Sequence, residues 1–449
     1  MTETKIIVLD DDPTGSQTVH SCLLLTRWDT ATLREALADD APLFFVLTNT
    51  RGMDAARASE LTREVCRNLR CALDDLAAAG RSIQPLLVSR SDSTLRGHYP
   101  VETDVIAEEL GPFDAHFLVP AFFEGGRVTV DSVHYIETDG ERARVDQTEF
   151  ARDSVFGFST SFLPDYVAEK TRGRIPSSSV ERFLLADVRG DVRQRLAELG
   201  GNVCCAVDCE RQADLDGFTA QVLEAVAAGK RFLFRSGASL LTSLAGLPPQ
   251  PVAAEAMHRY RRSDAPGAVL VGSHVRKSTD QLNRLLSEPG VRPVEVDVDR
   301  IADERDPLLT EVVDKVAAIH ADGLTPVIYT SRTERTFSDQ ATRLAFGEQV
   351  SGFLMDVVRR LPPTLSFLIS KGGITSNDVL SDGLALRRAR VLGQILPGCS
   401  VVRCPDDHPL YPNLPVVIFP GNVGDQHGLA TVHRRLANPA PAGERSAAA

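Results

Sequence analysis

The sequence of 449 residues predicts an α/β protein with two domains, each built on a mainly parallel sheet. Two observations support this prediction. Short apolar runs alternate with longer helical stretches in both halves of the chain. A proline-rich segment separates the halves, as expected of a domain boundary. We therefore expect a first domain over residues 1–245, a linker over 246–267, a second domain over 268–436 and a disordered tail over 437–449.

In the first half, each apolar run ends in a polar turn, which predicts buried strands followed by loops. The predicted strands are residues 5–9, 43–47, 85–88, 115–119, 203–207 and 231–234. An amphipathic pattern over 56–79, closed by Gly80, predicts a long helix, and a second helix is predicted over 218–228. The pattern weakens between about residues 128 and 175, which indicates an irregular or β-rich insertion.

The second half repeats the alternation of strand and helix. Its predicted strands are residues 268–272, 326–329, 365–369 and 416–419. One helix is expected to begin near Asp280, and the proline-rich segment has room for another over 253–261.

The charge balance argues against a general nucleic-acid binder. The chain has 49 Lys and Arg against 61 Asp and Glu, a formal net charge of −12, whereas nucleic-acid binding calls for a basic face. The sequence contains no uninterrupted run of about 18 apolar residues, so we expect no membrane span. The N-terminus does not resemble a signal peptide. We expect a cytoplasmic protein that binds small molecules.

Two polar turns of the first half are candidate ligand-binding loops, because open α/β sheets bind ligands outside the carboxyl ends of their strands. The first is Asp10-Asp11-Asp12-Pro13-Thr14-Gly15. Its carboxylates could hold Mg²⁺, accept substrate hydroxyls or act as a base, or they could serve only for capping and solvation. The second runs from Ser89 to Gly97 and combines two arginines, one aspartate and several hydroxyls. It predicts a pocket for a small polyhydroxy acid, with a salt-bridged surface loop as the alternative.

Three glycine-rich turns follow predicted strands of the second half. They are Gly272 to Thr279, Ser370 to Asp378 and Pro420 to Asp425. One such turn could simply start a helix, but three in one domain indicate a phosphate-bearing ligand, because glycine lets backbone N–H groups approach an anion. The first turn is not a Walker A loop, since Arg276 stands where glycine is required.

Taken in order, these motifs resemble the four-carbon acid sugar kinase family. The resemblance rests on Asp10 to Gly15, Asp92 to Gly97, Gly372-Gly373-x-Thr375-Ser376 and Gly421-Asn422-x-Gly424, and it spans about residues 5–435. It implies an N-terminal sugar-acid-binding domain and a C-terminal nucleotide-binding domain. It also implies transfer of phosphate from ATP, with Mg²⁺, to a terminal hydroxyl of threonate, erythronate or 3-oxo-tetronate.

The resemblance leads to a hypothesis for the functional residues. Asp92, Asp12 or Asp11 takes or orients the proton of the substrate hydroxyl. The remaining substrate-binding positions are Asp10, Thr14, Gly15, Arg90, Ser93, Thr94 and Arg96, with Arg90 or Arg96 holding the carboxylate. The nucleotide-binding positions are Gly272, Ser273, Lys371, Gly372, Gly373, Ile374, Thr375, Gly421, Asn422 and Gly424. Lys371 or Lys277 neutralises the transferring phosphoryl group, and no metal ligands are assigned.

Two departures from the family pattern keep other functions open. Val275 and Ile374 stand where the family often has Ser and Glu. One alternative is a sugar-acid sensor that binds without turnover. Another is a haloacid-dehalogenase-type phosphatase, because Asp10-x-Asp12-x-Thr14 after an apolar strand matches its nucleophile motif. A homodimer is expected because two-fold dimers are the commonest oligomers.

Overall fold

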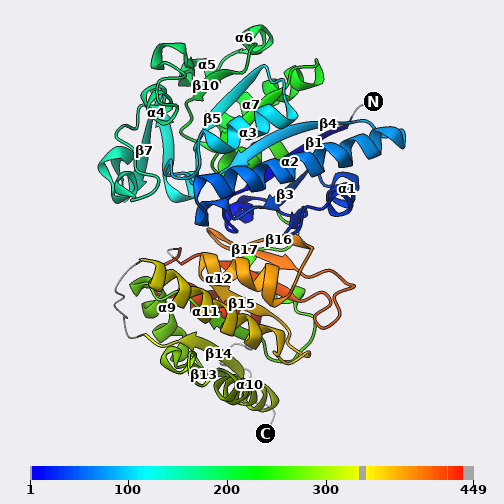
Figure 1. The fold of residues 1–449 in the computed structure, drawn as a ribbon, viewed down its shortest axis with the longest axis vertical. Coiled ribbons are helices and arrows are strands. Elements are labelled where there is room, and N and C mark those ends of the chain that lie inside the picture. The colour runs from blue at the N-terminus through cyan, green and yellow to red at the C-terminus, as the bar shows by residue number, and fades with distance from the viewer. Residues whose placement is uncertain (1–2, 139, 333–339, 422, 438–449) are drawn as a thin grey trace. The chain divides into compact units, whose positions relative to one another are not determined.

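The computed structural model describes residues 3–138, 140–332, 340–421 and 423–437. Two compact units divide the chain, Met1–Pro249 and Gln250–Ala449 (Figure 1). The segment predicted as a linker is shared between them. Its residues from 250 onward include a 3-10 helix, η7 (Ala254–Tyr260), which buries Met257 in the core of the second unit. Residues 438–449 of the predicted tail lie outside the described residues, and Ala437 ends the last helix.

The first unit contains a parallel sheet with the strand order β2-β3-β1-β4-β11-β5-β10-β9. These strands are β1 (Glu3–Asp10), β2 (Leu23–Leu25), β3 (Leu43–Leu47), β4 (Ile83–Arg90), β5 (Ala115–Val119), β9 (Glu181–Phe183), β10 (Val203–Val207) and β11 (Phe232–Ser236). The helices are α1 (Thr30–Ala38), α2 (Ala55–Ala78), α3 (Val101–Leu110), α4 (Leu163–Lys170), α5 (Leu185–Val188), α6 (Arg193–Glu198), α7 (Gln212–Ala227) and α8 (Ser239–Ala245).

The register of the central strands brings distant polar residues to one edge. Asp10 at the end of β1 is paired with Leu47 of β3 and with Arg90 of β4. Arg90 is in turn paired with Ser236 at the end of β11. The loops that follow these strands therefore emerge side by side.

Apolar side chains cover both faces of this sheet. On one face, Leu61, Val65 and Leu69 of α2 pack against the central strands, and α2 lies across them in Figure 1. Elsewhere in the sheet an aromatic cluster surrounds Phe117 of β5. Its ring lies within 5.9 Å, centroid to centroid, of four other buried rings, those of Phe183, Phe218, Phe232 and Phe234.

The predicted insertion contains a three-stranded antiparallel sheet of β6 (Arg127–Val130), β7 (Val133–Thr138) and β8 (Glu141–Arg144), and it continues to α4. The insertion is anchored to the loop after β4. His134 Nε2 lies 2.7 Å from the carbonyl of Ser93, and the hydroxyl of Tyr166 donates to the carbonyl of Leu95 at 2.8 Å.

The second unit has the strand order β13-β14-β12-β15-β18-β17-β16. The strands are β12 (Ala268–Val271), β13 (Val291–Val296), β14 (Thr325–Thr330), β15 (Leu368–Lys371), β16 (Arg388–Leu396), β17 (Cys399–Arg403) and β18 (Pro415–Phe419). The helices are α9 (Arg276–Leu286), α10 (Arg305–Ala321), α11 (Gln340–Arg359), α12 (Gly373–Asp378) and α13 (Gly428–Ala437). The first five strands in this order are parallel, β17 runs antiparallel to β18, and β16 runs antiparallel to β17.

The predicted fold class is confirmed, since the chain has two domains with mainly parallel sheets. The prediction missed several strands. In β13 only three of six residues are buried, so its apolar signal is weak. The strand predicted over 365–369 begins later, at Leu368, and its buried end includes Lys371. Among the described residues, no helix combines the length and apolar character needed to cross a membrane.

Removing the central ring of the aromatic cluster should destabilise the first unit. We expect Phe117→Ala to lower the free energy of unfolding by about 3–5 kcal/mol, because the cavity cannot collapse among four packed rings. The fluorescence of Trp28, the one tryptophan and part of the first unit, measures this in a urea titration. Val155→Ala is the control: its side chain is exposed, so we expect a change within about 0.5 kcal/mol. Equal stability of the two variants would contradict the prediction.

Candidate functional site

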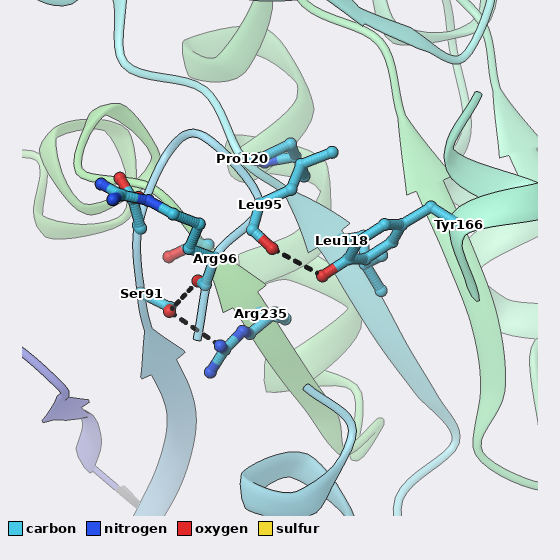
Figure 2. A pocket seen from close by; sticks show the side chains of 9 residues that line it. Ser91, Leu95, Arg96, Leu118, Pro120, Tyr166 and Arg235 are labelled. Atoms are coloured by element: carbon cyan, nitrogen blue, oxygen red, sulfur yellow. Dashed lines mark hydrogen bonds and ion pairs between the residues drawn. The ribbon is translucent and has the colours of Figure 1, made fainter. Parts of the chain in front are cut away.

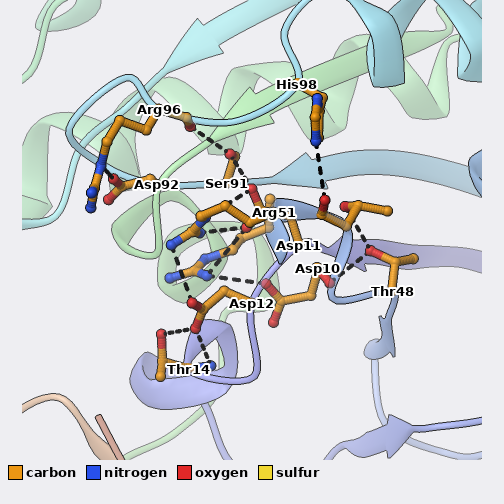
Figure 3. A network of polar contacts seen from close by, with 12 residues as sticks. Asp10, Asp11, Asp12, Thr14, Thr48, Arg51, Ser91, Asp92, Arg96 and His98 are labelled. Carbon is orange, nitrogen blue, oxygen red and sulfur yellow. Dashed lines mark hydrogen bonds and ion pairs between the residues drawn. The ribbon is translucent and has the colours of Figure 1, made fainter. Parts of the chain in front are cut away.

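The loops after β1, β3 and β4 form a network of carboxylates and guanidinium groups, which we call the acid–arginine network (Figure 3). It comprises Asp10, Asp11, Asp12, Arg51, Arg90, Asp92 and Arg96. Three adjacent carboxylates repel one another unless cations or hydrogen bonds compensate them. Each of the three has such compensation here.

Arg51 joins the second and third of these acids. Its Nη2 lies 2.5 Å from Asp11 Oδ1, and its Nη1 lies 3.2 Å from Asp12 Oδ2. Asp12 also accepts hydrogen bonds from the backbone N–H and the hydroxyl of Thr14, at 2.9 and 2.5 Å. Burial would raise the pKa of Asp12, but the guanidinium groups of Arg51 and Arg90 and the bonds from Thr14 lower it below its usual value. Asp12 is therefore ionised at neutral pH.

Asp10 is fully buried, and its environment differs from that of its neighbours. Its Oδ1 lies 3.1 Å from Arg90 Nη1, while its Oδ2 has no hydrogen-bond partner. Burial, opposed by Arg90 and reinforced by Asp11 and Asp12, raises the pKa of Asp10 to about 7. Gly15 packs directly on this carboxyl, because a Cβ there would stand 1.9 Å from Oδ2. Asp10 therefore lies at the buried base of the loop, between Arg90 and Gly15.

Asp92 is the acid of the loop after β4. It accepts hydrogen bonds from Thr94 Oγ1 at 2.5 Å and from Arg96 Nε at 2.6 Å. Burial opposes its ionisation, yet Arg51, Arg96 and the bond from Thr94 lower the pKa of Asp92 to about 2. Arg96 lies 3.5 Å from Asp153 and 4.9 Å from the ring centre of Phe150, so the insertion also positions this guanidinium.

Sequence reasoning overlooked several members of this site. Arg235 of β11 donates to Glu102 at 2.6 Å and to Ser91 at 2.7 Å, and Ser91 donates to Asp11 at 2.5 Å. Arg51 was also overlooked. A signal existed for both arginines, because each stands at or just after the end of a predicted strand, where ligand-binding residues gather. Linking them to Asp11 requires the strand order, which the sequence does not show.

A small cavity lies beside the network (Figure 2). It is lined by Ser91, Asp92, Leu95, Arg96, Leu118, Pro120, Tyr166, Arg235 and Ser236 and has a volume of about 20 Å³. A space of this size suits one water molecule. A four-carbon acid is larger, so the cavity does not define where a substrate binds.

In the second unit, the three glycine turns follow β12, β15 and β18 and converge on Ser273. A Cβ on Gly272 would stand 2.2 Å from Thr375 Oγ1, and one on Gly372, whose φ is +125°, would stand 3.2 Å from Ser273 Cβ. A Cβ on Gly421 would stand 3.2 Å from Ser273 Oγ. Close approach of the three turns thus accounts for these glycines.

Neighbouring side chains fix the turns in place. Gln281 of α9 donates to the carbonyls of Val423 and Asp425, at 3.0 and 2.6 Å, next to Gly424. Arg332, which the sequence analysis did not single out, donates to the carbonyl of Ser273 at 2.5 Å. The ends of the turns are more open. A Cβ on Gly373 would meet nothing within 4 Å.

The structure places the remaining predicted nucleotide-binding residues differently. Lys371 is fully buried, and its ammonium donates to the carbonyls of Pro420 and Gly421 at 2.5 and 3.1 Å. It therefore joins two turns and is not directed toward solvent. Ile374 and Val275 are exposed apolar side chains on these turns, at 74% and 46% exposure. Asn422 lies outside the described residues.

Burial makes Lys371 an unusual lysine. Desolvation, assisted by the charge of Lys277, lowers the pKa of Lys371 to about 7. The ammonium also lies 4.1 Å from the ring centre of Phe419, a contact that favours its charged form.

A larger cavity of about 400 Å³ lies at the ends of β13 and β14. Its lining is Glu295, Asp297, Val298, Asp299, Arg300, Leu308, Glu311 and Ser331. Four carboxylates against one guanidinium give the lining a negative charge, which repels phosphate. The glycine turns are thus the better place for an anion.

The fold and these two sites define a class: a two-domain α/β protein with a polar, arginine-rich site on one domain and glycine turns suited to phosphate on the other. Family comparison gives the same division. The family model of a sugar-binding N-terminal domain matches residues 6–244, and that of a nucleotide-binding C-terminal domain matches residues 268–429. The chain belongs to the four-carbon acid sugar kinase family.

A curated relative and two solved structures extend the comparison. Over 220 residues the chain is 28% identical to the D-erythronate kinase of Heliobacterium modesticaldum (strain ATCC 51547 / Ice1), covering 47% of this chain and 46% of that protein. The chain thus matches about half the length of this relative.

The solved structures show the fold alone, because their sequences are distant. A Salmonella typhimurium LT2 protein, provisionally described as a tRNA synthase, superposes with a TM-score of 0.72 at 18% identity, over 97% of this chain and 100% of that one. Haemophilus influenzae protein HI1011, of the DUF1537 family, superposes with a TM-score of 0.63 at 17% identity, over 96% of this chain and 100% of that one.

The contact between Gly15 and Asp10 predicts that a single methyl group disrupts the acid–arginine network. We expect Gly15→Ala to lower the free energy of unfolding of the first unit by about 1–3 kcal/mol, because the carboxyl must shift away from the added Cβ. Trp28 fluorescence in urea measures the change. Gly217→Ala in α7 is the matched control: its Cβ would meet nothing within 4 Å, so a stabilisation of about 0.5–1 kcal/mol is expected. A Gly15→Ala protein as stable as the wild type would contradict this account.

The buried ammonium of Lys371 predicts a pH dependence of stability. Its pKa is about 7 when folded, below the ordinary 10.5, so between these values the unfolded chain binds more protons. The contribution of Lys371 to the free energy of unfolding therefore rises with pH above about 7, by at most about 1.4 kcal/mol per pH unit.

We expect the stability of Lys371→Met relative to wild type to fall as pH rises from 7 to 8.5. Thermal unfolding followed by circular dichroism measures this difference. Lys315→Met, which removes an exposed lysine of α10, should show no such trend. A pH-independent difference between Lys371→Met and wild type would show that Lys371 is charged throughout the range.

Proposed function

We propose that this protein is an ATP-dependent kinase that phosphorylates a terminal hydroxyl of a four-carbon sugar acid. The observation that carries the proposal is the ionised Asp92, held by Thr94 and Arg96 at the edge of a sheet in the sugar-binding domain. Membership of the family and the relative named D-erythronate kinase support it. D-erythronate is therefore the first substrate to test.

Asp92 would orient the hydroxyl that attacks the γ-phosphate. A carboxylate with a pKa of about 2 is a weak base, but it accepts a hydrogen bond from the hydroxyl at any physiological pH. Phosphoryl transfer depends mainly on positioning and charge stabilisation, with little proton transfer needed early. Asp12, which is also ionised, is the second candidate, and Asp11 is engaged by both Arg51 and Ser91.

The phosphates of ATP would lie on the glycine turns of the nucleotide-binding domain. Close packing leaves little room over Gly272 and Gly421, whereas the backbone at Gly373 faces open space. We therefore assign Gly373 the closest approach to phosphate. Lys371 would act indirectly, by holding the Pro420–Gly421 turn in the conformation that receives the nucleotide.

The proposed reaction does not rely on a dedicated metal cage. Among the described residues, no group of three or more His, Cys, Asp and Glu side chains is arranged to hold a metal ion. Kinases commonly bind Mg²⁺ through substrate phosphates and only one or two carboxylates. Mg²⁺ supplies charge neutralisation when bound, and in our proposal this chain contributes at most one carboxylate to it.

The geometry weakens the alternative of a haloacid-dehalogenase-type phosphatase. That mechanism requires Asp10 to attack a phosphate, but Asp10 is completely buried between Arg90 and Gly15. A sugar-acid sensor requires binding without turnover, and the assay below distinguishes it. The homodimer and the cytoplasmic location remain predictions of the sequence.

The kinase is tested by ADP release from ATP and Mg²⁺ with the stereoisomers of erythronate, threonate and 3-oxo-tetronate. We expect ADP release with one acid or a narrow set of them. Release of phosphate from a phosphorylated acid without ATP would favour the phosphatase. Binding of an acid and of ATP without ADP release would favour the sensor.

Replacing the orienting carboxylate should remove most of the activity. We expect Asp92→Asn to lower kcat by about 100-fold or more, with an unchanged circular dichroism spectrum. Asp104→Asn, which alters an exposed ion pair with Arg174, is the control and should keep wild-type kcat. Near wild-type turnover by a folded Asp92→Asn protein would rule out the role given to Asp92.

A further inference from the structure

The arginines around the Asp92 loop differ in one respect, the presence of a carboxylate partner. Four of the buried or partly buried ones have such a partner. The shortest ion-pair distances are Arg51–Asp11 2.5 Å, Arg90–Asp10 3.1 Å, Arg96–Asp92 2.6 Å and Arg235–Glu102 2.6 Å. The positive charge of each is thus offset within the protein.

Arg127, the first residue of β6, is the exception. It forms no ion pair with any residue in the described parts of the chain, and its buried Nε has no hydrogen-bond partner. Its Nη1 donates to the carbonyl of Gly125. Burial lowers the pKa of Arg127, against the attraction of Asp92. A half-buried guanidinium without a direct ion-pair partner is costly, so its retention requires a reason.

The position of Arg127 is built into the fold. A Cβ on Gly125 would stand 2.2 Å from Arg127 Nη1 and 2.7 Å from the ring of Phe122, so a larger residue there would displace the guanidinium from this position. The strand that carries Arg127 is fixed at both ends. Thr129 exchanges two backbone hydrogen bonds of 2.9 Å with Cys209, and β6 pairs with β7 along its whole length.

The same sheet connects Arg127 to the Asp92 loop. His134 of β7 bonds to Thr129 Oγ1 at 2.9 Å on one side of its ring and to the carbonyl of Ser93 at 2.7 Å on the other. His134 thus ties the strand that begins at Arg127 to the loop that carries Asp92. A sugar acid bound at this loop would therefore meet the small sheet to which Arg127 belongs.

We infer that Arg127 binds the carboxylate of the sugar-acid substrate and is the charge-selecting residue of the site. This rests on the proposed function. A guanidinium with free N–H donors matches a carboxylate in both charge and geometry. The ligand carboxylate would supply the ion-pair partner that Arg127 lacks among the described residues. Arg90, one of the two residues expected from the sequence to hold this carboxylate, is buried and already paired with Asp10.

The inference also assigns the anion to the substrate and not to the nucleotide. Arg127 lies within the sugar-binding domain, residues 6–244, whereas the phosphate-binding turns belong to the nucleotide-binding domain. Binding of the acid measured without nucleotide therefore tests the role of Arg127 separately from the nucleotide site.

The test is isothermal titration of D-erythronate, and of its uncharged analogue erythritol, into the full-length protein without nucleotide. We expect Arg127→Gln to weaken D-erythronate binding by about 10- to 100-fold and to leave erythritol binding within about two-fold. Arg127→Lys should bind D-erythronate more tightly than Arg127→Gln, because the charge is kept. Gly125→Ala, which displaces the guanidinium, should also weaken D-erythronate binding.

Arg142→Gln is the matched control, since Arg142 lies in the same small sheet but is exposed and paired with Glu137. It should bind D-erythronate like the wild type. The inference is overturned if Arg127→Gln binds D-erythronate within two-fold of wild type, or if it loses both ligands equally. Binding of D-erythronate by the wild type with no ADP release once ATP and Mg²⁺ are added would count against the kinase but leave the role of Arg127 intact. Unaltered turnover by Arg127→Gln would refute the role of Arg127 and leave the proposed kinase intact.

Discussion

The buried contact between Asp10 and Arg90 is the constraint on which the first site depends. Parallel pairing of β1 with β4 brings the two residues into register at the edge of the sheet. A buried carboxylate needs a cation, and Arg90 supplies it. The loop after β1 then folds back over the pair, and Gly15 permits that close approach. The two following acids are then directed to Arg51, and the Asp92 loop closes over them through Ser91.

The second unit applies the same principle with one lysine. Lys371 carries its buried amino group to the point where two glycine turns meet, where it donates to two backbone carbonyls and lies against the ring of Phe419. In both domains, therefore, a buried cation at the end of a parallel strand fixes the shape of a loop, while more exposed groups remain available to a ligand.

The sequence predicts the fold class and most central strands, because buried parallel strands are continuous apolar runs with polar ends. It also identifies the Asp10–Gly15 and Asp92–Gly97 loops. It does not show which strands are neighbours. Arg51 and Arg235 were overlooked because their partners are fixed by the strand order β3-β1-β4-β11. Lys371 was expected to face phosphate. Its burial could not be predicted, because it depends on how β15 packs beside β18.

The way in which the small sheet attaches to the Asp92 loop has an evolutionary consequence. His134 and Tyr166 both bond to main-chain carbonyls, those of Ser93 and Leu95, and every amino acid supplies that acceptor. These two anchors therefore tolerate substitution of the loop residues that they hold, whereas the contacts of Asp153 and Phe150 depend on the side chain of Arg96.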